Sequence, residues 1–172
     1  SCAVYFDQDA KPVATFTARK IRQCPVEMGV GSLVESIDAT EVKELAVSFL
    51  SKINYKGIAE VEFKKDALTG EFKIIEVNPR SWIQNNLAFA CGVDFSYLLY
   101  ADLAGFPKPQ INRQKYGIKW LGSEWDLKSY LMLKRQGKIK FGDWFNSLRG
   151  KKVFALFEWR EQLPFLFCWL CF

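Results

Sequence analysis

The sequence predicts an α+β fold, in which an antiparallel sheet with flanking helices is followed by a small basic α/β appendage. Short β-rich runs are separated by polar or glycine-containing turns, as in hairpins. Longer segments place apolar residues at helical spacing. The 172 residues are 49% hydrophobic and 25% charged, which is typical of globular proteins and provides a core without a disulfide scaffold.

The chain contains no histidine. This excludes Ser-His-Asp and Cys-His nucleophiles and histidine-ligated zinc, and leaves carboxylates, amides, Lys, Arg and Cys for any chemistry. Five cysteines without a regular spacing predict a reduced cytoplasmic protein. Cys168 and Cys171 form one C-x-x-C pair inside the apolar run 163–172. That run is shorter than the roughly 20 residues of a membrane-spanning helix, so we expect a docked tail there.

Two β-rich runs near the start, residues 3–6 and 13–17, enclose a polar turn and predict a first hairpin. A loop rich in polar residues, with one proline and two glycines, is expected over 20–32. A short strand is expected over 32–35.

A helix is expected next. Asp38 is placed to cap it, with Glu41 three residues later at the spacing of a capping box. The apolar residues that follow at i, i+3, i+4, i+7 and i+8 predict one buried stripe. They are Val42, Leu45, Ala46, Phe49 and Leu50.

Residues 57–65 and 71–78 predict a second hairpin closed by a short loop. We expect Asp66 to pair with Phe72 across this loop. Strict alternation then places Phe72 on the same face as Glu76.

In this register Glu62 stands directly opposite Glu76, and Asn78 stands opposite Glu60. Like charges in such positions repel, so a hard divalent cation between them is the simplest stabilising species. Arg80 follows just beyond the strand, where a guanidinium can hold an anionic substrate or a phosphoryl group. The spacing alone fits equally well a solvent-exposed sheet face with solvated glutamates.

Downstream of this hairpin, apolar periodicity and turn residues predict the remaining elements. They are helices over 82–90 and 95–103, a linker over 106–113, a strand over 116–121, helices over 124–135 and 143–148, and a strand over 152–159. The charge changes at the linker, since residues 106–152 hold twelve basic and three acidic residues and the rest of the chain holds twelve and sixteen. We therefore expect two parts, 1–105 and a basic, aromatic extension over 106–172.

Several segments together resemble the C-terminal half of the ATP-grasp fold, and more closely the carbamoyl-phosphate synthase-like and carboxylate–amine ligase-like members. They are GIAEVEF at 57–63, FKIIEVNPR at 72–80, FTARKIR at 16–22, SLVES at 32–36, CGVDF at 91–95 and LPFL at 163–166. The resemblance is strong over residues 1–105 and loose beyond them.

This resemblance implies a role for five residues. Glu62 and Glu76 are expected to bind Mg²⁺ or Mn²⁺, with Glu76 bridging two ions and Asn78 completing the second site. Arg80 is expected to act on the phosphoryl group or carboxylate, and Lys20 to lie near the ATP phosphates. For Lys20, a solvated cluster of basic residues is an equally good interpretation.

The reaction implied by the resemblance is activation of a carboxylate by ATP to an acyl phosphate, which an amine or similar nucleophile attacks. The expected partners are small carboxylate and amine substrates, with no nucleic acid and no membrane span, and a homodimer is compatible with them. The upstream half of the ATP-grasp domain is missing from these residues, so we expect a fragment that is inactive by itself. The alternative is a non-catalytic module whose basic C-terminal segment binds a partner protein or an anionic surface.

Overall fold

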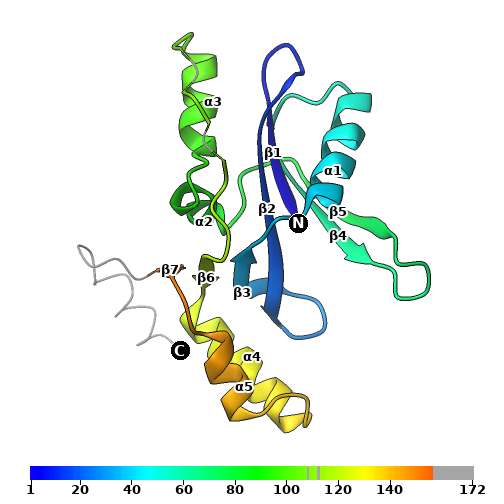
Figure 1. Ribbon diagram of the computed structural model, residues 1–172, viewed down its shortest axis with the longest axis vertical. Helices are drawn as coiled ribbons and strands as arrows, with labels where there is room; N and C mark the ends of the chain where they lie inside the picture. Colours follow the sequence, from blue (N-terminus) through cyan, green and yellow to red (C-terminus); the bar gives the residue numbers. More distant parts are fainter. Residues whose placement is uncertain (108, 112, 157–172) are drawn as a thin grey trace. The chain divides into compact units, whose positions relative to one another are not determined.

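The computed structural model describes residues 1–107, 109–111 and 113–156 (Figure 1). Its elements are β1 (Cys2–Phe6), β2 (Pro12–Cys24), β3 (Val30–Ser36), α1 (Thr40–Lys52), β4 (Gly57–Lys65), β5 (Phe72–Asn78), α2 (Asn85–Ala90), α3 (Phe95–Leu103), β6 (Lys119–Leu121), α4 (Ser123–Arg135), α5 (Phe141–Ser147) and β7 (Lys152–Phe154). Among the described residues, seven strands have the hydrogen-bonded order β5-β4-β1-β2-β3-β6-β7, which confirms the α+β class.

The chain divides into two compact units. Unit 1 comprises residues 1–19 and 36–116, and unit 2 comprises residues 20–35 and the described residues from 117 onward. Strand β2 contributes its first part to unit 1 and its second part to unit 2. The pair Cys168 and Cys171, the run 163–172 and the end of the strand expected over 152–159 lie outside the described residues.

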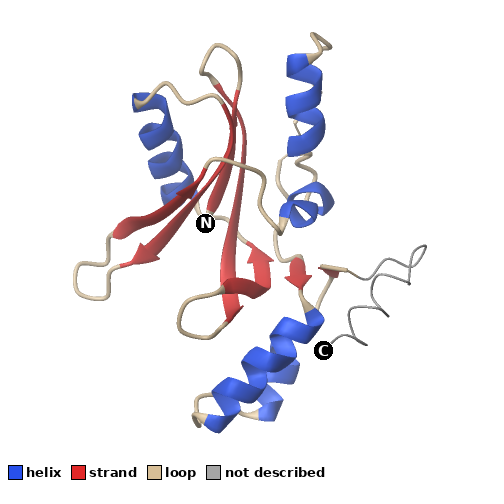
Figure 2. Cartoon of the chain, turned by 180° about the vertical axis from the view of Figure 1, so that it is seen from behind, coloured by secondary structure: helices blue, strands red, loops and turns tan. Residues whose placement is uncertain are grey.

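In unit 1, strand β1 lies between β2 and β4 and is antiparallel to both, which confirms the first hairpin. Helix α1 covers one face of these strands (Figure 2). The core on this face comprises Cys2, Val4 and Phe6 from β1, Val42, Ala46 and Leu50 from α1, and Ala59 and Val61 from β4. Leu45 of the expected stripe is 39% exposed, because the buried residues of α1 follow an i, i+4, i+8 spacing.

The opposite face of β1 is turned toward α3. The fully buried Tyr5 alternates with Val4 and Phe6, and its hydroxyl donates a hydrogen bond of 2.6 Å to Asp102 Oδ2 on α3. The helix expected over 82–90 begins only at Asn85. Trp82 precedes that helix and is buried, where its ring packs against two others, Phe16 at 6.4 Å and Phe95 at 5.2 Å between centroids.

Two expectations about local structure in this region were wrong. Helix α1 begins after Ala39, and Asp38 makes no capping bond to its backbone; instead its carboxylate accepts from the Thr40 hydroxyl at 3.2 Å. The loop expected over 20–32 is shorter, because β2 continues to Cys24 and β3 starts at Val30.

In unit 2, β3 pairs antiparallel with β6, and β6 pairs in parallel with β7. Helices α4 and α5 follow β6 and form a helical hairpin (Figure 1). Both helices were expected close to these positions, whereas the strand expected over 116–121 begins only at Lys119. No helix in the described part of the chain combines the length and the apolar character that crossing a membrane requires.

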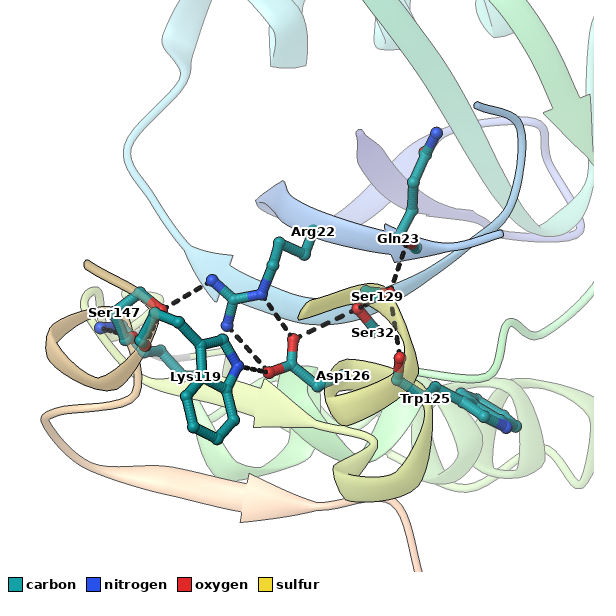
Figure 3. A network of polar contacts seen from close by, with 9 residues as sticks. Arg22, Gln23, Ser32, Lys119, Trp125, Asp126, Ser129 and Ser147 are labelled. Atoms are coloured by element: carbon teal, nitrogen blue, oxygen red, sulfur yellow. Dashed lines mark hydrogen bonds and ion pairs between the residues drawn. The ribbon is translucent and has the colours of Figure 1, made fainter. Parts of the chain in front are cut away.

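A buried polar network joins β2, β3, α4 and α5 in unit 2 (Figure 3). Both oxygens of Asp126 accept from Arg22, with 2.8 Å from Nε to Oδ1 and 2.9 Å from Nη2 to Oδ2. Ser32 Oγ and Trp144 Nε1 donate to the same carboxylate at 3.3 and 2.8 Å. The Asp126 carboxylate accepts these four hydrogen bonds and neutralises the charge of Arg22. This explains how β2 can continue through a segment whose sequence predicts a polar loop.

Candidate metal and nucleotide site

The carboxylates of Glu62 and Glu76 are brought together by the β4–β5 hairpin. The two residues are cross-strand partners, and Glu60 is the partner of Asn78, as the sequence predicts. Residues directly opposite each other have Cβ atoms about 5 Å apart. The face is set by alternation, because Val61 and Val77 pack on the core beneath α1 and the glutamates therefore point to the other face.

The rest of the expected register was wrong by one residue. Lys65, and not Asp66, pairs with Phe72, because the register shifts between Glu62 and Phe63. The resulting bulge reverses the alternation along β5. Phe72 consequently packs against the core under α1, on the face opposite to the one expected.

Arg80 lies two residues beyond the end of β5 and contacts Asn78. Its Nη2 lies 3.4 Å from Asn78 Oδ1, and its Nη1 donates to the Ser81 carbonyl at 3.2 Å. The backbone N–H of Arg80 also donates to the Asn78 carbonyl at 2.8 Å. These bonds turn the chain so that the guanidinium lies beside the amide at the end of β5, with Arg80 itself exposed to solvent.

The donor set suits a hard divalent cation. Two carboxylates and one amide oxygen come from adjacent strands, and Mg²⁺ is commonly held by one or two carboxylates together with water and substrate phosphates. Within the described ranges, no group of three or more His, Cys, Asp and Glu residues is arranged to hold a metal without such help. The residues present therefore fit a metal that arrives with phosphate oxygens better than a closed structural site.

Lys20 lies on the second part of β2 and is half-buried. It belongs to unit 2, whereas the other four candidates belong to unit 1. Glu60 is an acidic residue of the same sheet face that was not among the candidates. Glu60 is only 7% exposed. Its predicted position opposite Asn78 was the feature of the sequence that could have marked it as a candidate.

Residues 18–99 match the family described as carbamoyl-phosphate synthase L chain, ATP binding domain. The matched family is a member of the ATP-grasp superfamily. All five candidate residues, Lys20, Glu62, Glu76, Asn78 and Arg80, fall inside the matched segment. The match confirms the resemblance that the hairpin motifs indicated.

Solved structures with a similar fold include a variant of Rhizobium etli pyruvate carboxylase with the allosteric activator acetyl coenzyme A. It is 22% identical, the TM-score is 0.53, and the match covers 69% of this chain and 13% of that chain. The same variant crystallised without acetyl coenzyme A is likewise 22% identical, with a TM-score of 0.53, and the match covers 69% of this chain and 13% of that chain. About two thirds of the chain thus shares its fold with a small part of a much longer enzyme. No curated protein sequence matches it significantly.

Proposed function

We propose that this ATP-grasp chain supplies the metal-binding hairpin and phosphate-facing arginine of a ligase that activates a carboxylate with ATP. The observation that carries this proposal is the pairing of Glu62 with Glu76 next to Asn78 and Arg80, inside the segment that matches an ATP-binding domain. Such a cluster of oxygen ligands beside one guanidinium is suited to phosphate chemistry.

Each side chain has a distinct task in the proposed site. Glu62 and Glu76 would hold Mg²⁺ or Mn²⁺, with Glu76 bridging two ions and Asn78 contributing its amide oxygen to the second. When bound, ATP supplies the phosphoryl group and the metal ions neutralise its oxygens. Lys20 would lie near the phosphates.

Arg80 would orient the carboxylate substrate and stabilise negative charge on the group in transfer. Its exposed guanidinium retains donors beyond those used by Asn78 and Ser81, because an arginine carries five N–H groups. The sheet face outside the core gives access to a substrate from solvent, since Glu76 and Arg80 are both exposed.

The reaction class is formation of an acyl phosphate followed by acyl transfer. A carboxylate oxygen attacks the terminal phosphorus of ATP and ADP leaves; an amine or similar nucleophile then attacks the acyl carbon and inorganic phosphate leaves. Neither step needs an imidazole, which is consistent with a chain that has no histidine. The substrates would be a small carboxylate and an amine.

Metal binding tests the site without requiring turnover. Mn²⁺ is titrated into the 172-residue chain and bound ion is measured by electron paramagnetic resonance, with wild type compared with Glu62→Gln, Glu76→Gln and Glu71→Gln. Glu71 is an exposed carboxylate of the same hairpin and serves as the control. We expect affinity to fall about tenfold or more for the first two variants and to be unchanged for the third.

Equal Mn²⁺ affinity in Glu76→Gln and wild type would remove the metal assignment. The activity is tested by phosphate release from ATP in the intact gene product, with a panel of carboxylates and amines. Release that needs neither Mg²⁺ nor a carboxylate would overturn the ligase proposal. For the 172-residue chain alone we expect weak ATP binding by calorimetry.

A further inference from the structure

The helical hairpin α4–α5 of unit 2 ends in a surface that combines cations with exposed aromatic rings. We call it the basic tip and define it as Lys134, Arg135, Lys138, Lys140, Phe141 and Phe145. It contains the end of α4, the connecting turn and the start of α5. The turn lies at the end of this helical hairpin (Figures 1 and 2).

Its two phenylalanines are exposed although the ring cluster behind them is well packed. Phe141 is 60% and Phe145 is 52% exposed, and their rings stack at 6.1 Å between centroids with an interplanar angle of 21°. Behind them, Tyr130 and Trp144 stack at 4.5 Å, and Phe141 lies 6.3 Å from Tyr130 and 5.7 Å from Trp144. The two rings thus pack on this cluster and leave apolar area in contact with water.

The cations of the basic tip greatly outnumber nearby acids. Residues 128–152 contain eight Lys and Arg and a single acid, Asp143. The carboxylates of Glu124 and Asp126 on α4 are buried and do not offset the surface charge. One further acid is close, because the Gln136 amide donates to the Glu27 carboxylate at 3.3 Å.

We propose that the basic tip docks on an anionic lipid surface. Clustered Lys and Arg on a helical segment are attracted to acidic headgroups, and exposed aromatic rings gain free energy by entering the boundary between headgroups and acyl chains. Long lysine and arginine side chains can lay their apolar stems along a surface and extend their charged ends to the headgroups, so the two kinds of contact are compatible. In this proposal the cations of the basic tip bind the acidic headgroups while its exposed rings enter the apolar boundary of the bilayer.

The ring geometry favours lipid over single-stranded nucleic acid. Stacking on a base needs a free aromatic face. Here Phe141 and Phe145 stack on each other and Phe141 also packs on two further rings, so their faces are already occupied in part. Insertion into lipid has no such requirement, because it depends on exposed apolar area alone.

Co-sedimentation of the 172-residue chain with vesicles tests the proposal. We expect binding to vesicles of phosphatidylcholine mixed with phosphatidylserine, weak binding to phosphatidylcholine alone, and a fall in affinity as salt increases. The double variant Lys138→Gln/Lys140→Gln should lose about tenfold or more in affinity, since each cation near the surface contributes about fivefold. The matched control Lys52→Gln/Lys56→Gln removes equal charge from exposed positions in unit 1 and should bind almost normally.

The apolar contribution is tested with Phe141→Ser/Phe145→Ser, which we expect to reduce affinity about tenfold or more. Leu68→Ser is its control, because Leu68 is 97% exposed in the β4–β5 loop. Circular dichroism and urea unfolding of each variant check that the fold is kept. Glu27→Gln leaves the tip intact and should strengthen binding.

Three outcomes would overturn the proposal. One is equal binding to neutral and acidic vesicles, and another is equal loss in the tip and control variants. The third is preferential binding of a single-stranded RNA oligomer over acidic vesicles. None of them bears on the metal site of the β4–β5 hairpin, so this inference and the proposed function fail or stand separately.

Discussion

Glu62 and Glu76 are direct cross-strand partners on β4 and β5, and the register shift lies immediately beyond them toward the loop. Like charges at such positions destabilise a sheet. The core contacts of Val61 and Val77 fix which face the two carboxylates occupy, so the hairpin holds both on the same face of the sheet. In the proposed site, a cation that binds both carboxylates would offset this repulsion.

Metal binding should therefore stabilise the chain, and removing one carboxylate should abolish the effect. A ligand at 100 times its dissociation constant adds about 2.7 kcal/mol. We expect Mg²⁺ or Mn²⁺ to raise the melting temperature of the wild type and not that of Glu76→Gln. Without metal, Glu76→Gln should be equal to the wild type or more stable by about 0.2–1 kcal/mol, because a repulsion is lost.

Differential scanning fluorimetry with and without metal measures both effects. Glu71→Gln is the control and should retain the metal-dependent shift. A Glu76→Gln variant that is strongly destabilised without metal would show that this carboxylate has a structural role instead.

The ion pair between Arg22 and Asp126 should be costly to break from one side. Their side chains are 5% and 1% exposed, so Asp126→Ala leaves a guanidinium buried without its partner. The expected loss is about 3–5 kcal/mol in free energy of unfolding. Urea denaturation followed by tryptophan fluorescence measures it.

Two further variants distinguish charge burial from general damage to α4. Arg22→Met/Asp126→Leu removes both charges and should recover much of the loss, since apolar pairs replace buried ion pairs at little cost. Asp143→Ala, at an exposed position of α5, should change stability by less than about 0.5 kcal/mol. If the free energy of unfolding of Asp126→Ala lies within about 1 kcal/mol of the wild-type value, the buried ion pair does not have the expected effect on stability.

The same pair shows where sequence reasoning ends. Periodicity and turn residues predicted the hairpins, α3 and α4 because these depend on contacts between near neighbours in the chain. Residues 20–24 were expected to form a loop because they are rich in polar and charged residues. The structure makes them part of β2, where Asp126, 104 positions away in the sequence, neutralises the charge of Arg22. No local pattern contains that partner.

The candidate site was predictable in a similar, partial way. The pairing of Glu62 with Glu76 followed from alternation, but the position of the bulge did not, because it depends on Phe72 and Val77 both packing beneath α1. The contact of Arg80 with Asn78 likewise depends on a backbone turn centred on Pro79 that spacing alone does not specify. The cross-strand pairing of the candidate ligands was thus predictable, and the bulge and the turn beside them were not.

Cys2 should be unreactive in the folded chain. It is fully buried, and burial raises the pKa of its thiol from 9.0 to about 12. Because the folded-state pKa is raised, the contribution of the neutral thiol to stability is complete below pH 9 and is lost as the pH rises from 9 to about 12. Alkylation at pH 8 followed by peptide mapping should label the half-buried Cys24 before Cys2, with both labelled equally in urea. Rapid labelling of Cys2 under native conditions would contradict this burial.

The hydrogen bond from Tyr5 to Asp102 should tie α3 to the sheet. Tyr5→Phe removes the 2.6 Å bond and leaves the carboxylate without this donor, at an expected cost of about 1.5–3 kcal/mol for a bond to a charged group. Burial and then the bond to Asp102 raise the pKa of the phenol, so its contribution is present below pH 10 and is lost as pH rises through the folded-state pKa. Urea unfolding of Tyr5→Phe measures the cost, with Tyr100→Phe as the control because Tyr100 is 57% exposed on the same helix. Hydrogen exchange should show faster opening of α3 in Tyr5→Phe alone, and equal exchange in both variants would show that packing, and not this bond, holds the helix.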